Sequence, residues 1–389
     1  MEHEIREYDG LMELLEDLDR EGITGFQRRE AYTRFLNLQA RMKGCVYGGG
    51  FELTPMCNFD CKMCYVHLNG SQMTQPILTT EQWLNIMQQA IDAGMMHADL
   101  TGGECLTHPG FKELYTFLRT RGVEVSVLTN GQLLTEEIAD LFAQYPPSVV
   151  QITVYGSDED AYEAVTGRRA FADVCAAIER LKKRGIHVFL PITPNRFMQE
   201  DTHALLEFLR NTGVRYAVGT GSLPAREDTG RTLEGYAPDD ALYVRLHKDE
   251  QAYHQTLPKG SAIPFKGAMV DRVPRGFKGI SAIPCSSGQC AFHINWKGEM
   301  QPCIPFHTIT RSVLEHGFAD CWAWIKEQMA AYQPPQECLA CEYAATCVSC
   351  PAERTLGVLN GPVNKAVCSR YACYVREGIT HLPQEESCK

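Results

Sequence analysis

Three cysteines fall within eight residues in the segment Cys57-Asn58-Phe59-Asp60-Cys61-Lys62-Met63-Cys64. Gaps of three and then two residues allow all three thiolates to lie on one side of a compact loop. Thiolates are the ligands of iron–sulfur clusters, which ordinarily take four cysteines, so three leave one iron open to a small molecule. Two other interpretations of the segment alone are a zinc knuckle and reduced cysteines packed as small apolar side chains.

The segment resembles the cluster-binding motif of the radical S-adenosylmethionine (radical SAM) superfamily. It follows the strand-like run Phe51-Glu52-Leu53, it precedes the aromatic Tyr65, and a Gly-Gly-Glu sequence lies about forty residues downstream. The resemblance implies that Cys57, Cys61 and Cys64 hold a [4Fe–4S] cluster whose open iron is chelated by S-adenosyl-L-methionine (SAM). It also implies reductive cleavage of SAM to a 5′-deoxyadenosyl radical, which abstracts hydrogen from a substrate.

Length and composition predict a soluble, cytoplasmic metalloprotein. The chain has 389 residues, 44% hydrophobic and 22% charged, which is enough for a full barrel and a further module. No apolar run approaches twenty residues and the acidic N-terminus lacks an apolar core, so we expect neither a membrane span nor a signal peptide. The net charge of −11, without a dense Lys/Arg block, argues against a nucleic-acid partner. Seventeen cysteines in a reducing compartment indicate metal or redox chemistry.

The order of sequence patterns predicts an α/β protein with several parts. Residues 1–45 are predicted helical, 46–256 alternate strand and helix, 257–284 form a Pro- and Gly-rich connector, 285–375 are rich in cysteine, and 376–389 are a tail. Alternation of this kind indicates βα units on a parallel sheet. By the resemblance, the fold is a partial (βα)6 TIM-like barrel followed by a small SPASM domain. We expect the N-terminal helices to cap the bottom of the barrel; the alternative is a substrate-recruiting arm.

The predicted elements have the following ranges. Strands are expected near residues 49–54, 97–101, 123–129, 148–155, 186–192 and 214–219. Barrel helices are expected near residues 79–93, 110–121, 134–143, 171–184, 201–212 and 239–255. Catalytic residues of a parallel barrel lie at the carboxyl ends of its strands, which places the motifs below at one end.

The second predicted strand ends at Thr101-Gly102-Gly103-Glu104. Two glycines permit close approach of the backbone to a ligand, and a carboxylate accepts hydrogen bonds from an ammonium group. After a cysteine triplet this sequence resembles the superfamily's GGE motif, which contacts the amino group of SAM. Cys105, where relatives usually have proline, is expected to be a small buried thiol.

Later strand ends carry weaker signals. Thr129-Asn130-Gly131 resembles the superfamily's TNG and is expected to be structural. Thr153 matches a serine that contacts the ribose of SAM in relatives, and Tyr155 replaces an aspartate. Arg168 falls where relatives place an arginine near the SAM carboxylate; a solvated arginine is the alternative. Six residues are candidates for a catalytic acid or base, but a buried or solvated side chain without a catalytic role explains each of them equally well, so none is assigned. They are Glu104, His108, Tyr155, His187, His293 and His307.

The C-terminal cysteines resemble the SPASM module, which carries two auxiliary [4Fe–4S] clusters. Position by position, the first auxiliary cluster takes Cys285, Cys290, Cys303 and Cys350, and the second takes Cys338, Cys341, Cys347 and Cys368. Two residues rather than three separate Cys347 from Cys350, so Cys373 or Cys321 could replace Cys350, or that cluster could keep an open iron. The rival interpretation is a pair of four-thiolate zinc sites.

Auxiliary clusters imply an overall oxidation, and SPASM enzymes act mostly on peptides. The leading hypothesis is oxidative modification of a ribosomally made peptide, such as a thioether or carbon–carbon cross-link, with flavodoxin or ferredoxin as electron donor. The alternatives are a small-molecule dehydrogenase or epimerase, formylglycine formation of the anaerobic sulfatase-maturase kind, and a non-catalytic iron–sulfur scaffold. Ile304 weakens the sulfatase hypothesis, because those relatives carry a catalytic aspartate at that position.

Overall fold

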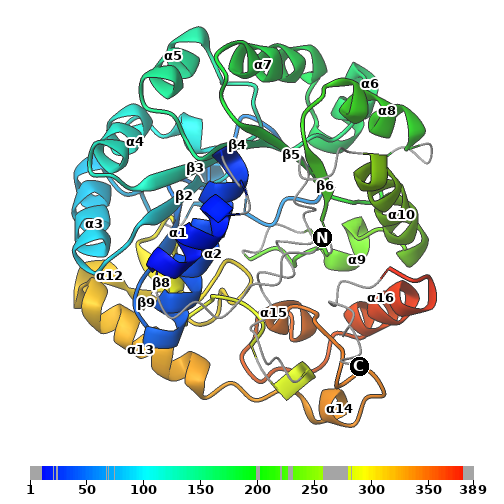
Figure 1. Cartoon of the computed structure of the whole chain (residues 1–389). Helices are drawn as coiled ribbons and strands as arrows, with labels where there is room; N and C mark the ends of the chain where they lie inside the picture. Colours follow the sequence, from blue (N-terminus) through cyan, green and yellow to red (C-terminus); the bar gives the residue numbers. More distant parts are fainter. Residues whose placement is uncertain are drawn as a thin grey trace.

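A parallel sheet with surrounding helices forms the centre of the molecule (Figure 1). The computed structural model describes residues 11–379 apart from 21, 23–24, 67, 69, 74, 199–201, 220, 227–230, 257–278 and 282. Six strands pair in parallel with their sequence neighbours: β1 (Gly48–Glu52), β2 (His97–Thr101), β3 (Glu124–Thr129), β4 (Val149–Ile152), β5 (Val188–Ile192) and β6 (Tyr216–Val218). The predicted partial barrel of parallel strands is confirmed.

The barrel helices lie outside the sheet and bury one apolar face against it (Figure 1). The six predicted helices are α3 (Thr80–Asp92), α4 (Phe111–Thr120), α5 (Glu136–Gln144), α7 (Phe171–Lys183), α8 (His203–Asn211) and α10 (Asp240–Thr256). Two short helices, α6 (Glu159–Thr166) and α9 (Leu233–Tyr236), were not predicted. Three short 3-10 helices are η1 (Gly70–Gln72), η2 (Cys105–Thr107) and η3 (Gly279–Ser281).

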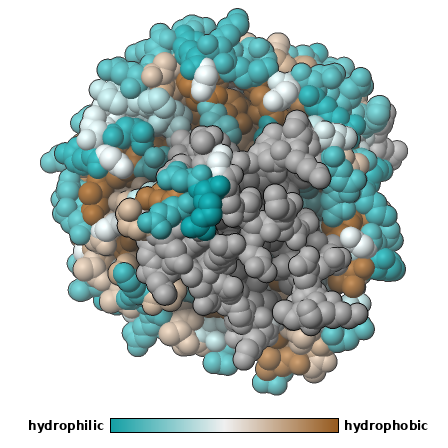
Figure 2. All heavy atoms as spheres, viewed as in Figure 1, coloured by the Kyte–Doolittle hydropathy of each residue, from teal (hydrophilic) through white to brown (hydrophobic). Residues whose placement is uncertain are grey.

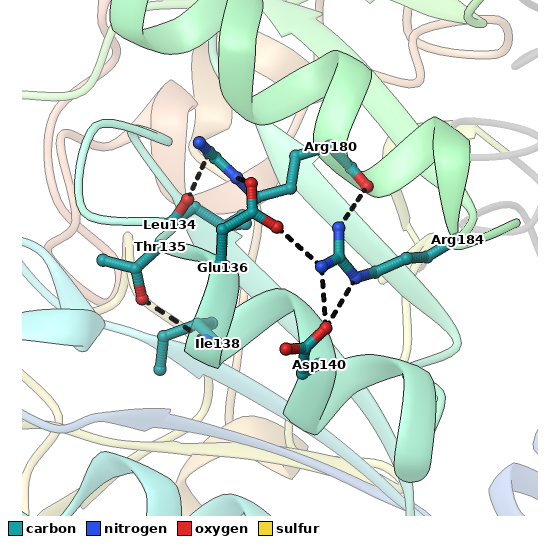
Figure 3. Close-up of polar contacts among 7 residues, drawn as sticks. All are labelled: Leu134, Thr135, Glu136, Ile138, Asp140, Arg180 and Arg184. Atoms are coloured by element: carbon teal, nitrogen blue, oxygen red, sulfur yellow. Dashed lines mark hydrogen bonds and ion pairs between the residues drawn. The ribbon is translucent and has the colours of Figure 1, made fainter.

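Neighbouring barrel helices are linked by exposed ion pairs as well as by packing. Arg184 of α7 contacts Glu136 and Asp140 of α5 at 2.6 and 2.7 Å, and Arg180 donates to Glu136 at 2.7 Å (Figure 3). Thr135 caps α5 by accepting from the amide of Ile138. Exposed pairs of this kind contribute little stability, so the apolar faces hold the helices in place.

The cysteine-rich region continues the barrel sheet. Strand β7 (Ala291–Ile294) pairs in parallel with β1, and β8 (Glu299–Gln301) and β9 (Arg311–Ser312) follow in antiparallel order. The ring of Phe51 packs edge-on against Trp83 of α3 and Phe292 of β7, at centroid distances of 6.1 and 5.7 Å. A Cβ at Gly49 would lie 2.2 Å from the Phe292 ring, so glycine there makes room for β7. The sequence analysis did not foresee this pairing.

The remaining helices lie in two places in Figure 1: the N-terminal pair runs from the centre of the view downward, and the helices of the C-terminal region lie along the lower part. They are α1 (Leu11–Arg20), α2 (Gly25–Lys43), α12 (Val313–His316), α13 (Phe318–Ala330), α14 (Gln336–Leu339), α15 (Pro351–Arg354) and α16 (Lys365–Arg376). The amide of Phe318 at the start of α13 donates to Gln89 of α3 at 2.9 Å. Ser369 of α16 donates to Asp240 of α10 at 2.6 Å. The C-terminal region therefore contacts barrel helices at two separate points.

Helix α2 lies against the first cysteines of the C-terminal region. Ser286 donates to the Asn37 side chain at 3.1 Å, and Arg41 donates to Gln289 at 3.3 Å. These residues precede β7, at the amino-terminal ends of β1 and β7, because Tyr47 and Gly48 donate to the carbonyl of Cys290. This position agrees with the predicted cap at the bottom of the barrel.

Most of the predicted connector, and the tail from residue 380, lie outside the described residues, as do residues 1–10. Figure 2 shows mostly hydrophilic residues along the described outer rim, over the helices that surround the sheet. None of the described helices is both long enough and apolar enough to span a bilayer.

Candidate active site and cysteine centres

The segment with three cysteines forms a loop at the carboxyl end of β1. It lies against the loop that follows β2: Gly103 donates to the carbonyl of Thr54 at 2.7 Å, and Glu104 donates to that of Met56 at 2.8 Å. A Cβ at Gly103 would lie 2.4 Å from the Met56 oxygen, and one at Gly102 would lie 2.5 Å from the Thr54 oxygen. The glycines therefore allow two loops to pack together. Contact of Thr101, Gly102 and Gly103 with SAM stays a prediction.

The three thiols Cys57, Cys61 and Cys64 are close enough to affect one another electrostatically. Burial raises the pKa of Cys57 to about 12, with Glu104 and Cys64 adding to the shift. Burial also raises the pKa of Cys61, and Cys64 and Cys57 raise it further. The Phe59 amide, 3.4 Å from the Cys57 sulfur, acts in the opposite direction. The loop thus gathers three thiols, and burial disfavours the negative form of Cys57 and Cys61.

Glu104 is buried and joins the ends of β2 and β3. Its Oε1 accepts from the Leu106 amide at 3.0 Å and from the Thr129 hydroxyl at 2.8 Å, and its Oε2 accepts from the Asn130 amide at 2.7 Å. Asn130 also donates to the side chain of Asn58 in the cysteine loop at 2.7 Å. Thr129 and Asn130 therefore have the structural role expected of their motif.

Arg168 and Tyr155 both reach the cysteine loop from the segments after β4. The Arg168 guanidinium donates through Nε to the carbonyl of Asn58 at 3.2 Å. Tyr155 lies beside the three thiols; burial and these thiols raise its pKa, and its hydroxyl hydrogen bond to Cys61 lowers the pKa of that thiol. Thr153 lies just beyond β4, where its carbonyl accepts from Tyr162 at 3.5 Å. Contact of Thr153 and Arg168 with SAM stays a prediction.

Several of the candidate acid–base histidines have structural partners. His108 uses both ring nitrogens, donating to the Leu78 carbonyl at 3.1 Å and accepting from the Gly110 amide at 3.1 Å. Burial lowers its pKa. His187 contacts the Ser148 carbonyl at 3.2 Å and His307 contacts the Pro305 carbonyl at 3.1 Å.

A buried ion pair below the cysteine loop was missed by the sequence analysis. Glu52, the last residue of β1, is 1% exposed and contacts Arg226 at 2.6 Å and His293 of β7 at 3.4 Å. The Arg226 amide donates to the carbonyl of Tyr65, directly after the last cysteine of the loop. A charged residue at the end of an otherwise apolar strand was the available signal. Its partners come from residues 174 and 241 positions away, which no local pattern connects.

An inner cysteine set lies at the opposite end of β1. Burial raises the pKa of Cys303, and the neighbouring thiols of Cys350 and Cys285 raise it further. Burial raises the pKa of Cys290 to about 11, and Cys285 adds to it. The structure therefore brings together the four cysteines that the sequence analysis grouped as the first auxiliary site.

An outer cysteine set lies among the short helices α14 to α16. Burial raises the pKa of Cys368, and the neighbouring thiols of Cys338, Cys347 and Cys341 raise it further. The same burial effect raises the pKa of Cys338, which has Cys347 and Cys341 as neighbours. These are the four cysteines predicted for the second auxiliary site.

The proposed substitutes for Cys350 lie elsewhere. Cys321 is buried in α13, where its thiol donates to the carbonyls of Arg311 and Ser312. Cys373 lies on α16, 3.1 Å from the Arg376 guanidinium. Cys105 is fully buried and donates to the Leu128 carbonyl at 3.3 Å, as a small buried thiol should.

The donor chemistry of all three sets fits iron–sulfur clusters. Within the ranges given above, no three His, Cys, Asp or Glu side chains converge closely enough to ligate a single metal ion. A cluster binds each thiolate through a different iron, so its ligands are neighbours at wider spacing. Buried thiols that raise one another's pKa need a positive group before they can ligate as thiolates.

Comparison with known proteins gives concordant matches. Residues 51–209 match the family model of the radical SAM superfamily. The antilisterial bacteriocin subtilosin biosynthesis protein AlbA of Bacillus subtilis (strain 168) is 27% identical over 258 residues, which cover 66% of this chain and 54% of that protein. A probable GTP 3′,8-cyclase of Saccharolobus solfataricus is 28% identical over 218 residues, covering 54% of this chain and 70% of that protein. The chain thus spans only about half the length of AlbA.

A solved structure has the same fold over most of both chains. Streptococcus suis SuiB bound to S-adenosylmethionine superposes with a TM-score of 0.63 at 16% identity, covering 91% of this chain and 86% of that one. SuiB bound to precursor peptide SuiA superposes with a TM-score of 0.58 at 15% identity, covering 86% and 82%. The loop of three cysteines and the loops that pack against it lie within residues 51–209, the segment that matches the radical SAM superfamily model, and the C-terminal cysteines of this chain resemble the SPASM order.

Proposed function

We propose that this chain is a radical SAM oxidoreductase that modifies a ribosomally made peptide. The observation that carries the proposal is the arrangement of the cysteines: three in one loop at the carboxyl end of β1, an inner set that includes Cys290 at its amino end, and an outer set among the short helices α14 to α16. The similarity to AlbA, a bacteriocin biosynthesis protein, and the fold shared with SuiB, solved with a precursor peptide, support a peptide substrate.

At the first centre the chain supplies three thiolates and the groups that orient SAM. Cys57, Cys61 and Cys64 would hold the [4Fe–4S] cluster and leave one iron open. Glu104 accepts from Leu106, Thr129 and Cys105 through Oε1. Its Oε2 accepts from the Asn130 amide, and because a carboxylate oxygen has two lone pairs, Oε2 can accept the SAM amino group as well. Thr153 and Arg168 are proposed to contact the ribose and the carboxylate of SAM. When bound, SAM and the cluster supply the radical that removes a hydrogen atom from the substrate.

Clusters held by the inner and outer cysteine sets would accept an electron from the substrate, so the overall reaction would be an oxidation of the peptide. The inner set, Cys285, Cys290, Cys303 and Cys350, would hold the cluster that takes one electron from the substrate after the hydrogen atom has been removed. The outer set, Cys338, Cys341, Cys347 and Cys368, would pass that electron to a one-electron carrier protein. A proton leaves the substrate in the same step, so the peptide loses two hydrogens in total. Thioether or carbon–carbon cross-linking has this balance.

The proposal includes partners and location. A flavodoxin or ferredoxin would reduce the first centre, and the protein would act in the cytoplasm without membrane or nucleic acid. The acidic net charge of −11 supports the last point, since binding to phosphates rests on basic side chains.

Anaerobic co-expression with a short peptide encoded beside the gene tests the proposal. The expected result is a peptide lighter by two hydrogens, with no change when a Cys57→Ala variant replaces the wild type. An unchanged peptide that also takes up no deuterium from solvent would contradict a peptide substrate. Iron analysis of the wild-type protein should give about twelve irons for three clusters; zinc in the C-terminal sets would contradict the auxiliary clusters.

A second candidate function is the modification of a small molecule. The similarity to a probable GTP 3′,8-cyclase favours it over part of the chain. That match covers 54% of the chain, whereas the match to AlbA covers 66%. Formylglycine formation is disfavoured, because Ile304 stands where the catalytic aspartate of sulfatase maturases is expected.

A further inference from the structure

Arg354 is a buried arginine with unused hydrogen-bond donors. It is 2% exposed, and its Nη2 donates to the carbonyl of Ser349 at 3.0 Å. Its Nε and Nη1 are buried without a hydrogen-bond partner, and among the described residues no other side chain leaves two such atoms. Since buried donors are almost always hydrogen-bonded, these two indicate acceptors that the polypeptide itself does not provide.

No carboxylate among the described residues forms an ion pair with Arg354. The neighbouring Glu353 is used by Arg370, at 3.5 Å. A buried guanidinium cannot lose its proton to escape the cost of burial, so it needs a negative partner nearby. The partner must therefore be something other than a described Asp or Glu side chain.

The groups around Arg354 are thiols of the proposed clusters. Although burial raises the pKa of Cys338, the positive charge of Arg354 and a hydrogen bond from its side chain to this thiol lower it. Arg354 has the same effect on Tyr332, whose other charged neighbours are Cys338, Cys350 and Cys347. The Arg354 amide donates to the carbonyl of Cys350 at 3.0 Å, because Cys350 is the N-cap of α15 and Arg354 is its last residue. Arg354 thus lies where the outer set meets the last cysteine of the inner set.

An iron–sulfur cluster held by four thiolates is a negative partner with many acceptor atoms. Its reduced form carries one more negative charge than its oxidised form, so a buried positive charge nearby stabilises the reduced form and raises the reduction potential. Hydrogen bonds to the sulfurs act in the same direction. Arg41 beside the inner set is only partly buried and donates to Gln289, so solvent screens its charge more.

We infer that Arg354 is the charge partner of the outer cluster, where its two unused donors bind cluster sulfurs and raise that cluster's reduction potential. This inference rests on the proposed function, because it requires clusters in the C-terminal sets. An electron taken from the substrate by the inner cluster would then pass to the outer cluster, and from there to an oxidised one-electron carrier protein. Arg354 is a positioning and tuning residue; it need not touch the substrate.

Redox titration followed by electron paramagnetic resonance tests the inference. The full-length protein would be studied anaerobically with Cys57→Ala, so that only the auxiliary centres give signals. A Cys338→Ala variant identifies the signal of the outer centre by its loss. With Arg354→Gln, the midpoint potential of the outer centre should move to a more negative value while that of the inner centre stays unchanged, and Arg354→Lys should recover part of the shift.

The matched control is Arg370→Gln, which removes a buried guanidinium already neutralised by Glu353 and should move the outer potential less. Equal shifts for Arg354→Gln and Arg370→Gln, or no shift for Arg354→Gln with full iron content, would overturn the inference. Loss of iron in the Arg354 variants would also overturn it, in favour of a role in assembly. Zinc in place of iron in the wild type would instead show that the proposed function is wrong.

Discussion

The first cysteine centre and the inner cysteine set lie at opposite ends of β1 but are built in different ways. The first centre takes its three cysteines, Cys57, Cys61 and Cys64, from one loop that directly follows β1. The inner set draws Cys285 and Cys290 from the segment before β7, Cys303 from the segment after β8, and Cys350 from a third segment. Its convergence depends on β7 pairing with β1 and on packing of the C-terminal region.

This difference predicts different responses to mutation. The first centre should fail when one of its ligands is lost and should tolerate change elsewhere. The inner set should also be sensitive to residues that seat β7 on the barrel, although these residues bind no metal.

The largest effect is expected from loss of a first-centre ligand. Cys57→Ala should abolish SAM cleavage and remove about four irons per chain, because three thiolates are the minimum that holds this cluster. Both quantities can be measured on anaerobically reconstituted protein. Cys175→Ala, at a partly exposed thiol on α7, is the control and should retain both. Retention of SAM cleavage by Cys57→Ala would show that the loop is not the cluster site.

Loss of Cys350 should affect iron binding by the inner cysteine set and leave the first centre intact. Cys350→Ala should remove up to about four irons while SAM cleavage continues, because the inner set loses its fourth thiolate. Product formation should fall by a larger factor than SAM cleavage. Cys373→Ala is the matched variant, since Cys373 contacts Arg376 rather than the other cysteines. If Cys373→Ala loses iron and Cys350→Ala does not, the ligand assignment is reversed.

The buried ion pair at the carboxyl end of β1 should be the next most sensitive feature. Arg226→Met leaves Glu52 buried without its main cation and should lower the free energy of unfolding by about 3–5 kcal/mol near neutral pH. Urea unfolding measures this loss. Arg231→Met, which removes a pair with the exposed Asp60, should cost about 0–1 kcal/mol.

The pH dependence of that loss follows from the pKa of Glu52. Burial acts to raise this pKa, but Arg226 and His293 outweigh burial and hold it below the ordinary value of 4.5. A lowered pKa stabilises the fold above the unfolded value, and the stabilisation is lost as pH falls through the folded value. The difference between wild type and Arg226→Met should therefore shrink as pH is lowered below 4.5 and through the folded pKa of Glu52. A difference that grows with acidity would contradict the ion pair.

A smaller effect is expected at the contact between β1 and β7. Gly49→Ala adds a methyl group 2.2 Å from the buried ring of Phe292 and should lower the free energy of unfolding by about 1–3 kcal/mol. Gly48→Ala is the control, because the nearest atom to its new methyl group is 4.0 Å away. In Gly49→Ala, the iron content of the inner set should fall more than that of the first centre. Equal stability of the two variants would mean that the Phe292 ring can move aside for the added methyl group at little energetic cost.

Much of the fold and the first centre could be predicted from sequence because their signals are local. Alternation of strand and helix patterns, glycines after strand ends and the spacing of three cysteines each lie within a short segment. The helices α6 and α9 were missed because they are too short for a clear apolar period. Glu52 was missed because its partners, Arg226 and His293, are far away in sequence.

Sequence by itself determined the chemistry that is available: three thiols in one loop, eight more in the SPASM order, and strand ends that place the loop at the barrel mouth. Tertiary structure alone decided that Cys350 rather than Cys373 or Cys321 lies beside Cys303, and that β7 extends the sheet. It also placed Arg354, with two buried donors free, beside the outer thiols. The physical reason is that spacing constrains groups within a turn or loop, whereas the meeting of distant groups depends on how apolar faces pack and which buried charges find partners.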